Sequence, residues 1–501
     1  MSDSNSTFSR RDFLVAASGL SAAALPAAGK TVEPASPERL KVGVLSDIHV
    51  TNETPGEHGS NEYLRKALRY FDMQKVDAVL IAGDLFTSGR TSELEIVART
   101  WFEVFPGDRG GDGRHVERLF VTGNHDIDGC FYGRPKGESA KDCEARCKKD
   151  HFVFNRDEVW RRLFREPYEP CFVKTVKGYR FVLRHFPSDY THWGERSAPE
   201  AVFAAHGAEL KKEKVFFYCQ HVPGDDTVNA TWLIGGDKWH NGQDDGYLNK
   251  LLSGYPNCVC MTGHSHSSLC DERSIWQGRA DEHTAVSCGC LVGWAFASPG
   301  RENGHDTDKN PAPVREMPMF SATKVHQGML MTVYDNCIRF HKRDFRLDHA
   351  LGDDWIVPIG TNERPYTFDS RRELSTPPRF AAGATVGVRR IEKGRDRLGR
   401  EHPQVEVTFP SITSATGGDR AYDYSVRMEM MIGDAVRTVG EKRVYSDTFM
   451  NAEQDDVGDV RCLFAQSDVP CGRKVRFVVT PANCWMKHGE PVMSDWSVLV
   501  S

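Results

Sequence analysis

The sequence predicts an α/β domain with a largely parallel core sheet, followed by a C-terminal all-β sandwich. Two patterns carry this prediction. From residue 40 onward, short β-branched runs alternate with segments of helical period, an order typical of right-handed βαβ crossovers. Beyond residue 378, apolar and polar residues alternate with period two between clusters of turn residues, which indicates the half-buried strands of a sandwich.

Length and composition support more than one folded domain and exclude several classes of protein. The chain has 501 residues, of which 39% are hydrophobic and 10% aromatic, and this content argues against a disordered chain. A net charge of −6, from 64 basic and 70 acidic residues, argues against nucleic acid as a partner. No later run approaches about 18 uncharged apolar residues, so we expect no permanent membrane span.

The N-terminus, residues 1–29, is expected to be an export signal. The motif Ser9–Leu14 contains a twin arginine and precedes a mildly apolar run that ends at Ala28. This pattern is typical of the bacterial twin-arginine translocation (Tat) signal, and an ordinary positively charged terminus is the alternative. We therefore expect the Tat export machinery as a partner and a periplasmic or extracellular location.

The strands and helices of the first domain follow one another from residue 40. Residues 41–45 form a short β-branched run that predicts a buried strand. Further strands are predicted at residues 78–82 and 119–122, with helices between them at 63–75 and 92–105. An insertion of mixed charge is expected over about residues 127–195. Later strands are expected at residues 215–218, 258–261 and within 329–340.

The first domain is expected to cover residues 30–360, and a linker residues 361–378. This linker is polar and charged and contains Pro365, Pro377 and Pro378. Residues 379–501 are predicted to form a sandwich of the immunoglobulin or fibronectin type III kind. It carries no cluster of metal-binding residues, so we expect a packing or spacer module, with a binding module for an unknown partner as the alternative.

Polar side chains that can bind metal ions follow five of the strand segments. In an open α/β sheet, ligands bind at the carboxyl ends of the strands, so these segments are expected to converge. Glycines precede three of the residues and permit the tight turns that such positions need. The candidate residues are Asp47, His49, Asp84, Asn124, His125, His221, His264 and His266.

This set of donors predicts a centre with two metal ions. Mixed imidazole, carboxylate and amide ligands suit Mn, Fe or Zn better than Ca or Mg. The donors are too many for one tetrahedral ion, whereas two divalent ions about 3.5–4 Å apart, bridged by a shared carboxylate, would use them all.

As an ordered set, the motifs Asp-x-His, Gly-Asp, Gly-Asn-His-Asp, His and Gly-His-x-His resemble the calcineurin-like metallophosphoesterase superfamily. The resemblance covers roughly residues 40–346 and implies a pair of facing sheets flanked by helices. It implies that Asp47, His49 and His266 hold the first ion and that Asp84 bridges. It further implies that Asn124, His221 and His264 hold the second ion, while His125 acts on the leaving group.

The resemblance implies hydrolysis of a small phosphoester, in which a hydroxide bridging the two metals attacks phosphorus. His125 can donate a proton or hydrogen bond to the departing oxygen. Thr87 stands where the protein Ser/Thr phosphatases of the family carry an Asp that orients this histidine, so its partner is left open. The Gly-Asn-His-Asp form resembles that of the phosphodiesterase branches of the family, and this resemblance implies a preference for phosphodiesters. Alternatives are a phosphomonoesterase, a nuclease of the same superfamily, or a non-catalytic protein that binds through its sandwich.

Cysteines and aromatic loops give further expectations. In an exported protein, the four cysteines of the insertion are expected to form disulfides, with a zinc site or free thiols as alternatives; they are Cys130, Cys143, Cys147 and Cys171. The pairs Cys258/Cys260 and Cys288/Cys290 are expected to be buried core thiols. The loops around His221 are rich in His and Trp, and His240 is the first candidate there for a substrate-binding residue.

Overall fold

The computed structural model describes residues 32–52, 60–132, 136–187, 196–229, 231, 246–292, 325–395, 400–412, 418–446 and 458–499. The predicted export signal and the candidate residue His240 lie outside these residues. Within the described part of the chain, every helix is too short or too polar to cross a membrane.

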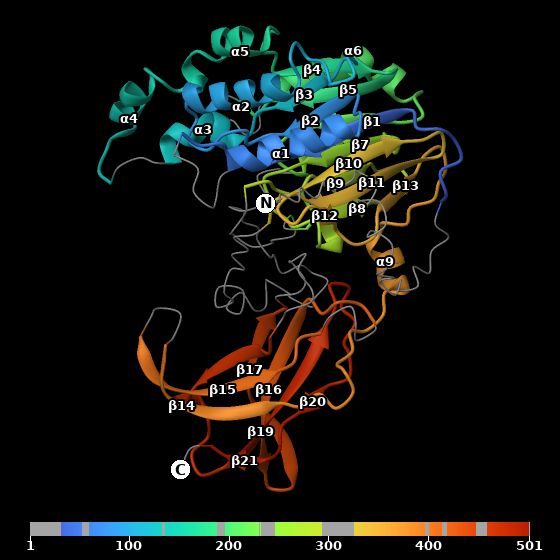
Figure 1. Ribbon diagram of the computed structural model, residues 1–501. Helices are drawn as coiled ribbons and strands as arrows, with labels where there is room; N and C mark the ends of the chain where they lie inside the picture. Colours follow the sequence, from blue (N-terminus) through green and yellow to red (C-terminus); the bar gives the residue numbers. More distant parts are fainter. Residues whose placement is uncertain are drawn as a thin grey trace, which may run out of the picture.

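The first domain is a sandwich of two facing sheets (Figure 1). The first sheet has seven strands in the order β12-β11-β10-β1-β2-β3, with β13 paired to β11. Strands β1, β2 and β3 run parallel, as predicted, whereas β10 runs antiparallel to β1, so the sheet is mixed. The strands are β1 (Leu40–Leu45), β2 (Ala78–Ala82), β3 (Glu117–Val121), β10 (Gln327–Val333), β11 (Cys337–Asp344), β12 (His349–Ala350) and β13 (Trp355–Pro358).

The second sheet has six strands in the order β4-β5-β6-β7-β9-β8. Its central strands β5, β6, β7 and β9 are parallel neighbours. The strands are β4 (Cys171–Val176), β5 (Tyr179–Arg184), β6 (Phe216–Cys219), β7 (Cys258–Thr262), β8 (Ile275–Gln277) and β9 (Thr284–Ser287).

Helices cover the outer faces of both sheets. Side chains such as Leu80, Phe181 and Met329 fill the layer between the sheets, while Phe71 and Trp101 pack α1 and α2 onto the outer face of the first sheet. The helices are α1 (Ser60–Met73), α2 (Thr91–Val104), α3 (Asn124–Tyr132), α4 (Ala140–Cys147), α5 (Arg156–Phe164), α6 (Ser197–Leu210) and α7 (Tyr247–Leu252), with 3₁₀ turns η1 (Phe152–Phe154) and η2 (Glu272–Ser274).

The C-terminal domain is the predicted all-β sandwich. Its buried side chains come from both of its sheets and include Val407, Val426 and Phe477. One sheet has the order β14-β15-β18, and the other has β17-β16-β19-β20 with β21 paired to β19. The elements are β14 (Gly387–Arg395), β15 (Glu401–Phe409), β16 (Asp423–Ile432), β17 (Ala435–Tyr445), β18 (Val460–Ala465), η5 (Gln466–Asp468), β19 (Lys474–Ala482), β20 (Val492–Met493) and β21 (Ser497–Val498).

Two predicted segments differ in the structure. The expected insertion contributes β4 and β5 to the second sheet, so that part of it belongs to the core architecture. The charged residue Lys174 makes this hairpin resemble an insertion in the sequence. In the structure its side chain lies on the same face of β4–β5 as Phe181, toward the first sheet, and pairs with Glu117 on β3 and with Glu166 at 2.9 and 2.7 Å. The expected linker contains a short helix, α9 (Phe368–Leu374), which lies between the two domains (Figure 1).

The expectation of disulfides in the insertion is wrong. All fourteen cysteines lie in the described residues, and each is a thiol outside any disulfide. The Sγ atoms of Cys143 and Cys147 are 4.0 Å apart, about twice the length of an S–S bond. With Cys130 they form a small buried cluster of thiols. The pairs Cys258/Cys260 and Cys288/Cys290 are buried, as predicted.

Candidate metal centre

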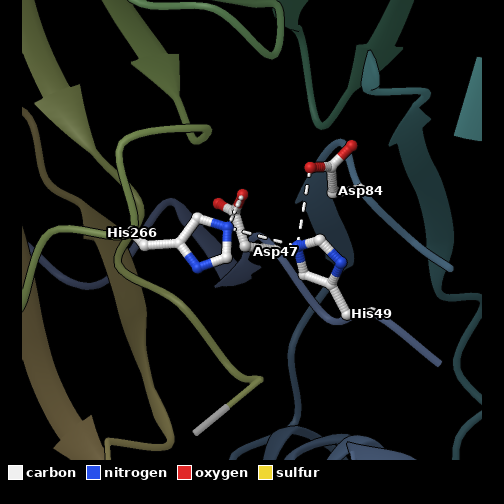
Figure 2. A group of neighbouring side chains, drawn as sticks. All are labelled: Asp47, His49, Asp84 and His266. Atoms are coloured by element: carbon white, nitrogen blue, oxygen red, sulfur yellow. Dashed lines mark hydrogen bonds and ion pairs between the residues drawn. The ribbon is translucent and has the colours of Figure 1, made fainter. Parts of the chain in front are cut away.

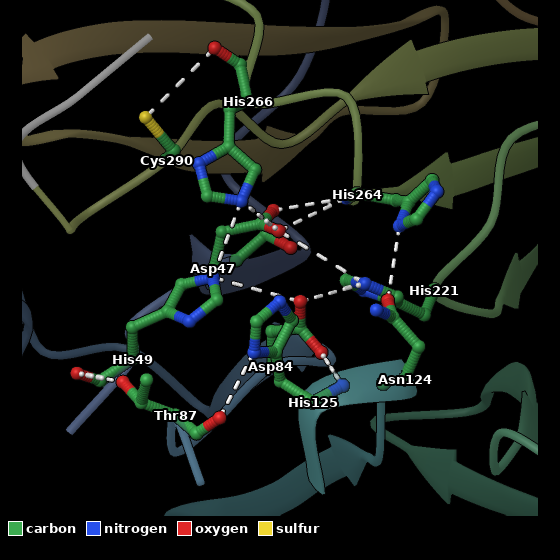
Figure 3. A network of polar contacts seen from close by, with 12 residues as sticks. Asp47, His49, Asp84, Thr87, Asn124, His125, His221, His264, His266 and Cys290 are labelled. Carbon is green, nitrogen blue, oxygen red and sulfur yellow. Dashed lines mark hydrogen bonds and ion pairs between the residues drawn. The ribbon is translucent and has the colours of Figure 1, made fainter. Parts of the chain in front are cut away.

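The carboxyl ends of β1, β2, β3, β6 and β7 meet at one edge of the two sheets, because β1–β2–β3 and β6–β7 are parallel neighbours. The structure therefore brings together eight residues that the sequence predicts for the site (Figure 3). They are Asp47, His49, Asp84, Asn124, His125, His221, His264 and His266. The ninth, His240, is outside the described residues.

Four buried side chains form the tightest group, with one donor atom from each lying within 4.8 Å of the others (Figure 2). His266 Nε2 lies 3.2 Å from Asp47 Oδ1 and 3.2 Å from His49 Nε2. His49 Nε2 lies 3.5 Å from Asp84 Oδ2. Asp84 thus stands at the side of this group that faces His221.

A second group adjoins the first through Asp84. His221 Nε2 lies 3.1 Å from Asp84 Oδ2, and the rings of His221 and His264 are 5.1 Å apart. His264 Nδ1 lies 3.0 Å from the side-chain oxygen of Asn124. The main-chain N–H of His264 also donates to Asp47, so the two groups share a backbone contact (Figure 3).

Much of the backbone at this site is strained. Positive φ angles of 50°, 52°, 49°, 68° and 46° occur at Asp47, His49, Asp84, His264 and His266. L-residues avoid this region, at a cost of about 1–3 kcal/mol each, and such strain is typical of functional sites. The preceding glycines are also required sterically: a Cβ at Gly263 would overlap Ser46 and Asp47.

The donor atoms fit divalent metal ions. His221 Nδ1 lies 2.7 Å from the carbonyl oxygen of Ala82, which can only accept, so Nδ1 carries the hydrogen. In the neutral ring, Nε2 then presents a lone pair toward the Asp84 carboxylate, and this buried Nε2 has no hydrogen-bond partner. Two acceptor atoms about 3 Å apart can both reach a cation about 2.0–2.2 Å from each of them. A metal ion would satisfy both.

The electrostatics favour neutral imidazoles at His49 and His264 and an ionised carboxylate at Asp84, which are the metal-binding forms. Burial lowers the pKa of His49 well below its usual value and that of His264 to about 3. At His221, burial is outweighed by the carboxylates of Asp84 and Asp47, which raise the pKa to about 9. Burial would raise the pKa of Asp84, but the facing histidines, His221 foremost, hold it well below its usual value. The group of donor atoms around Asp84 and His221 therefore attracts positive charge, as a proton or as a metal ion.

His125 lies beside both groups on the first turn of α3. Its main-chain N–H donates to Asp84 Oδ1 at 2.8 Å, and its ring packs edge-on against His49 with 4.6 Å between centroids. Its Nδ1 lies 2.9 Å from the main-chain carbonyl oxygen of Thr87. That carbonyl is the orienting partner that the sequence left open.

Two further residues support the site beyond those that the sequence predicts. Tyr132, two helical turns after His125, packs its ring 4.7 Å from the His125 ring and accepts a hydrogen bond from the Asn124 amide at 2.8 Å. Asp126, the last residue of Gly-Asn-His-Asp, accepts N–H groups of Gly123, Phe86 and Leu85, so it ties the loops after β2 and β3 together. Spacing along a helix could have indicated Tyr132.

Comparison with known proteins finds a family match within the first domain. Residues 40–268 match a family model described as calcineurin-like phosphoesterase. No curated protein matches the sequence.

Several solved structures resemble the chain at low identity. A dimetal phosphatase from Danio rerio is 11% identical, with 64% of this chain and 99% of that chain covered and a TM-score of 0.39. GAP50 of Plasmodium, the anchor in the inner membrane complex, is 11% identical, with 64% and 89% covered and a TM-score of 0.36. A 5'-nucleotidase precursor from Thermus thermophilus is 10% identical, with 84% and 93% covered and a TM-score of 0.28.

Proposed function

We propose that the chain hydrolyses small phosphodiesters with two divalent metal ions; the match of residues 40–268 to the calcineurin-like phosphoesterase family, whose members are phosphoric ester hydrolases, supports this. The observation that carries the proposal is the convergence of seven donor side chains, in which His221 Nε2 lies 3.1 Å from Asp84 Oδ2. Such an arrangement is stable when cations lie between the donors.

The two groups of side chains divide the metal ligands. Asp47, His49 and His266 would hold the first ion, and Asn124, His221 and His264 the second. Asp84 contacts both groups, at 3.5 Å from His49 and 3.1 Å from His221, so it would bridge the ions. When bound, two such ions lower the pKa of a water between them and neutralise charge on the phosphoryl oxygens.

His125 would serve the leaving group. Because its Nδ1–H is bound to the Thr87 carbonyl, its Nε2 is the nitrogen left to carry a proton to the departing oxygen. The hydrogen bond from its main-chain N–H to Asp84 holds His125 beside the bridging carboxylate. His240 is proposed to contact substrate, and His240→Ala should then raise KM with little change in kcat.

The preference for diesters is supported by the Gly-Asn-His-Asp form of the motif and by Thr87 in place of the Asp of the related protein phosphatases. Purified protein is reconstituted with Mn, Fe or Zn, and turnover of bis-para-nitrophenyl phosphate is compared with that of para-nitrophenyl phosphate. Faster turnover of the diester supports the proposal, and faster turnover of the monoester identifies a phosphomonoesterase. Asp84→Asn is the matched control, because it removes the bridging charge and should lose metal.

Metal that is bound without turnover of either ester would contradict this proposal and favour a protein that binds through its sandwich.

We also propose export by the Tat machinery to the periplasm or the medium, from the motif Ser9–Leu14. Lysines in place of Arg10 and Arg11 should leave the protein in the cytoplasm, as should a strain without the Tat translocase. Export of the twin-lysine variant would contradict it.

A further inference from the structure

The loop that carries His264 and His266 continues into a chain of buried polar side chains that ends at the C-terminal sandwich. We propose that the sandwich, through Tyr422 and Arg273, positions these two histidines. The inference rests on the proposed function in one respect, the role of His264 and His266 as metal ligands. Tyr422 and Arg273 are positioning residues, because neither touches the metal-binding atoms.

The chain of side chains begins within the loop itself. Ser265 lies between the two histidines, and its hydroxyl is 2.8 Å from that of Ser267. The Ser267 hydroxyl donates its hydrogen to the side-chain oxygen of Asn229, so the hydrogen between the two serines comes from Ser265. The Asn229 amide in turn donates to Asp271 Oδ2 at 2.5 Å.

All of these groups are inaccessible to water. Ser265 is 3% exposed and Ser267, Asn229 and Asp271 are 0% exposed. Each hydrogen bond therefore lacks competition from solvent, and a shift of Asp271 forces a shift or an unpaired polar atom at Ser267.

Arg273 holds Asp271 in place. Its Nε and Nη2 donate to the two oxygens of the Asp271 carboxylate at 2.9 and 2.7 Å, in a fork geometry. The side chains of both partners are fully buried. A buried ion pair needs further polar or aromatic contacts to offset its desolvation. Here the ring of Tyr422 supplies one, with the guanidinium carbon 4.3 Å from its centroid.

Tyr422 belongs to the sandwich, directly before β16. Two further contacts hold the same segment of the first domain against it. Arg420 donates to the carbonyl oxygen of Cys270, and Arg371 on α9 pairs with Glu272 at 2.9 Å while lying 5.0 Å from the ring of Trp485. The segment from Cys270 to Arg273 is thus bound on the sandwich side at three successive points.

The structure therefore gives the second domain a definite task. The metal-binding loop begins at the end of β7. Its other end is anchored to Asp271 and Arg273, whose position depends on Tyr422. Without that anchor, the strained φ angles of His264 and His266 would relax.

The test compares Tyr422→Leu with two controls in the full-length chain. Tyr422→Phe keeps the ring under Arg273 and should behave as wild type. Trp496→Leu removes a comparable cation–π contact inside the sandwich, where Arg476 lies 4.8 Å from the ring of Trp496. In the metal-free protein, amide hydrogen exchange over residues 263–274 should be at least about ten-fold faster in Tyr422→Leu only.

Metal binding is the second measurement. Affinity for Mn or Zn should fall about ten-fold in Tyr422→Leu and stay within about two-fold of wild type in both controls. Unchanged exchange in Tyr422→Leu overturns this inference. Failure of wild-type protein to bind metal overturns the proposed function instead, and the exchange data still decide the inference.

A variant within the first domain covers the case in which Tyr422→Leu does not fold. Asn229→Ala breaks the chain of hydrogen bonds between Ser267 and Asp271 and leaves the contact of Arg273 with the sandwich intact. The same acceleration of exchange over residues 263–274 shows that the loop depends on its link to Asp271, the step through which the sandwich would act, and unchanged exchange overturns the inference.

Discussion

The Nδ1 atom of His125 lies 2.9 Å from the main-chain carbonyl oxygen of Thr87. Because a carbonyl only accepts, this contact sets the tautomer of the ring with the hydrogen on Nδ1. A backbone group, which mutation of a side chain does not remove, therefore orients the proposed proton donor.

His125→Ala should lower turnover by about 10²–10⁴-fold, because it removes the group that carries a proton to the leaving oxygen. Metal content should persist, since the main-chain N–H to Asp84 and the seven metal donors stay. Elemental analysis of the reconstituted variant beside its turnover checks both statements. Loss of metal would mean that His125 is a ligand.

Thr87→Ala should keep turnover within about three-fold of wild type, because the orienting carbonyl remains. The Thr87 hydroxyl donates to the carbonyl of His49 at 3.0 Å, so the free energy of unfolding should fall by about 1 kcal/mol. Chemical unfolding and steady-state kinetics measure the two effects. A loss of turnover as large as that of His125→Ala would assign the orienting role to the side chain.

Tyr132→Phe should weaken binding of the second metal ion about ten-fold and leave the first nearly unchanged. The variant keeps the ring beside His125 but loses the hydroxyl that accepts from the Asn124 amide. Without this contact, the Asn124 side chain can turn its oxygen away. Metal titration that resolves the two sites checks this, and equal weakening of both would contradict it.

Stability should fall in mild acid because of His185. Burial lowers the pKa of His185 to about 3, whereas the unfolded chain has its usual value near 6.5. The neutral ring accepts from the N–H of Thr122 at 3.0 Å. The contribution of the neutral ring to the free energy of unfolding is complete above pH 6.5 and is lost as the pH falls toward 3. At pH 5 the free energy of unfolding should be lower by about 2 kcal/mol.

His185→Gln removes this titration. Its free energy of unfolding should change less between pH 7.5 and pH 5 than that of wild type, by about 2 kcal/mol. Urea unfolding at both pH values gives the difference. Identical pH dependence in the two proteins would place the acid-sensitive group elsewhere.

Thiol titration tests the cysteines. In denaturant without reductant, fourteen thiols should react, because every cysteine is outside a disulfide. In the native protein Cys471 should react fastest, since it is the exposed cysteine, and Cys471→Ser should remove that fast phase. Twelve or fewer thiols in denaturant would show disulfides.

The elements that could be predicted are those whose signal is local. Residues 78–82 coincide with β2 because an apolar run ends at Gly83, which has φ 92°. The eight site residues could be predicted because parallel strands bring their carboxyl ends together whatever the loops between them. Each of these residues has a side chain that can bind metal or transfer a proton, and the residue type alone indicates this.

The missed features depend on contacts between distant segments. In the sequence, the hairpin β4–β5 resembles an insertion because Lys174 places a charge on the face that packs toward the first sheet. The partners of this charge, Glu117 and Glu166, lie on other segments of the chain. The carbonyl of Thr87 has no signature in a sequence, since every residue has one. The prediction of disulfides depends on the compartment alone, which gives no distance between cysteines.

The positive φ angles of Asp47, His49, Asp84, His264 and His266 set stability against activity. Glycine or asparagine at any of these positions would relieve strain and stabilise the metal-free protein. Directed evolution for heat resistance without a selection for turnover would therefore accept such changes early. Thermostable variants found in this way should carry substitutions at the metal-ligand positions, and should lose turnover, before substitutions appear in the hydrophobic core.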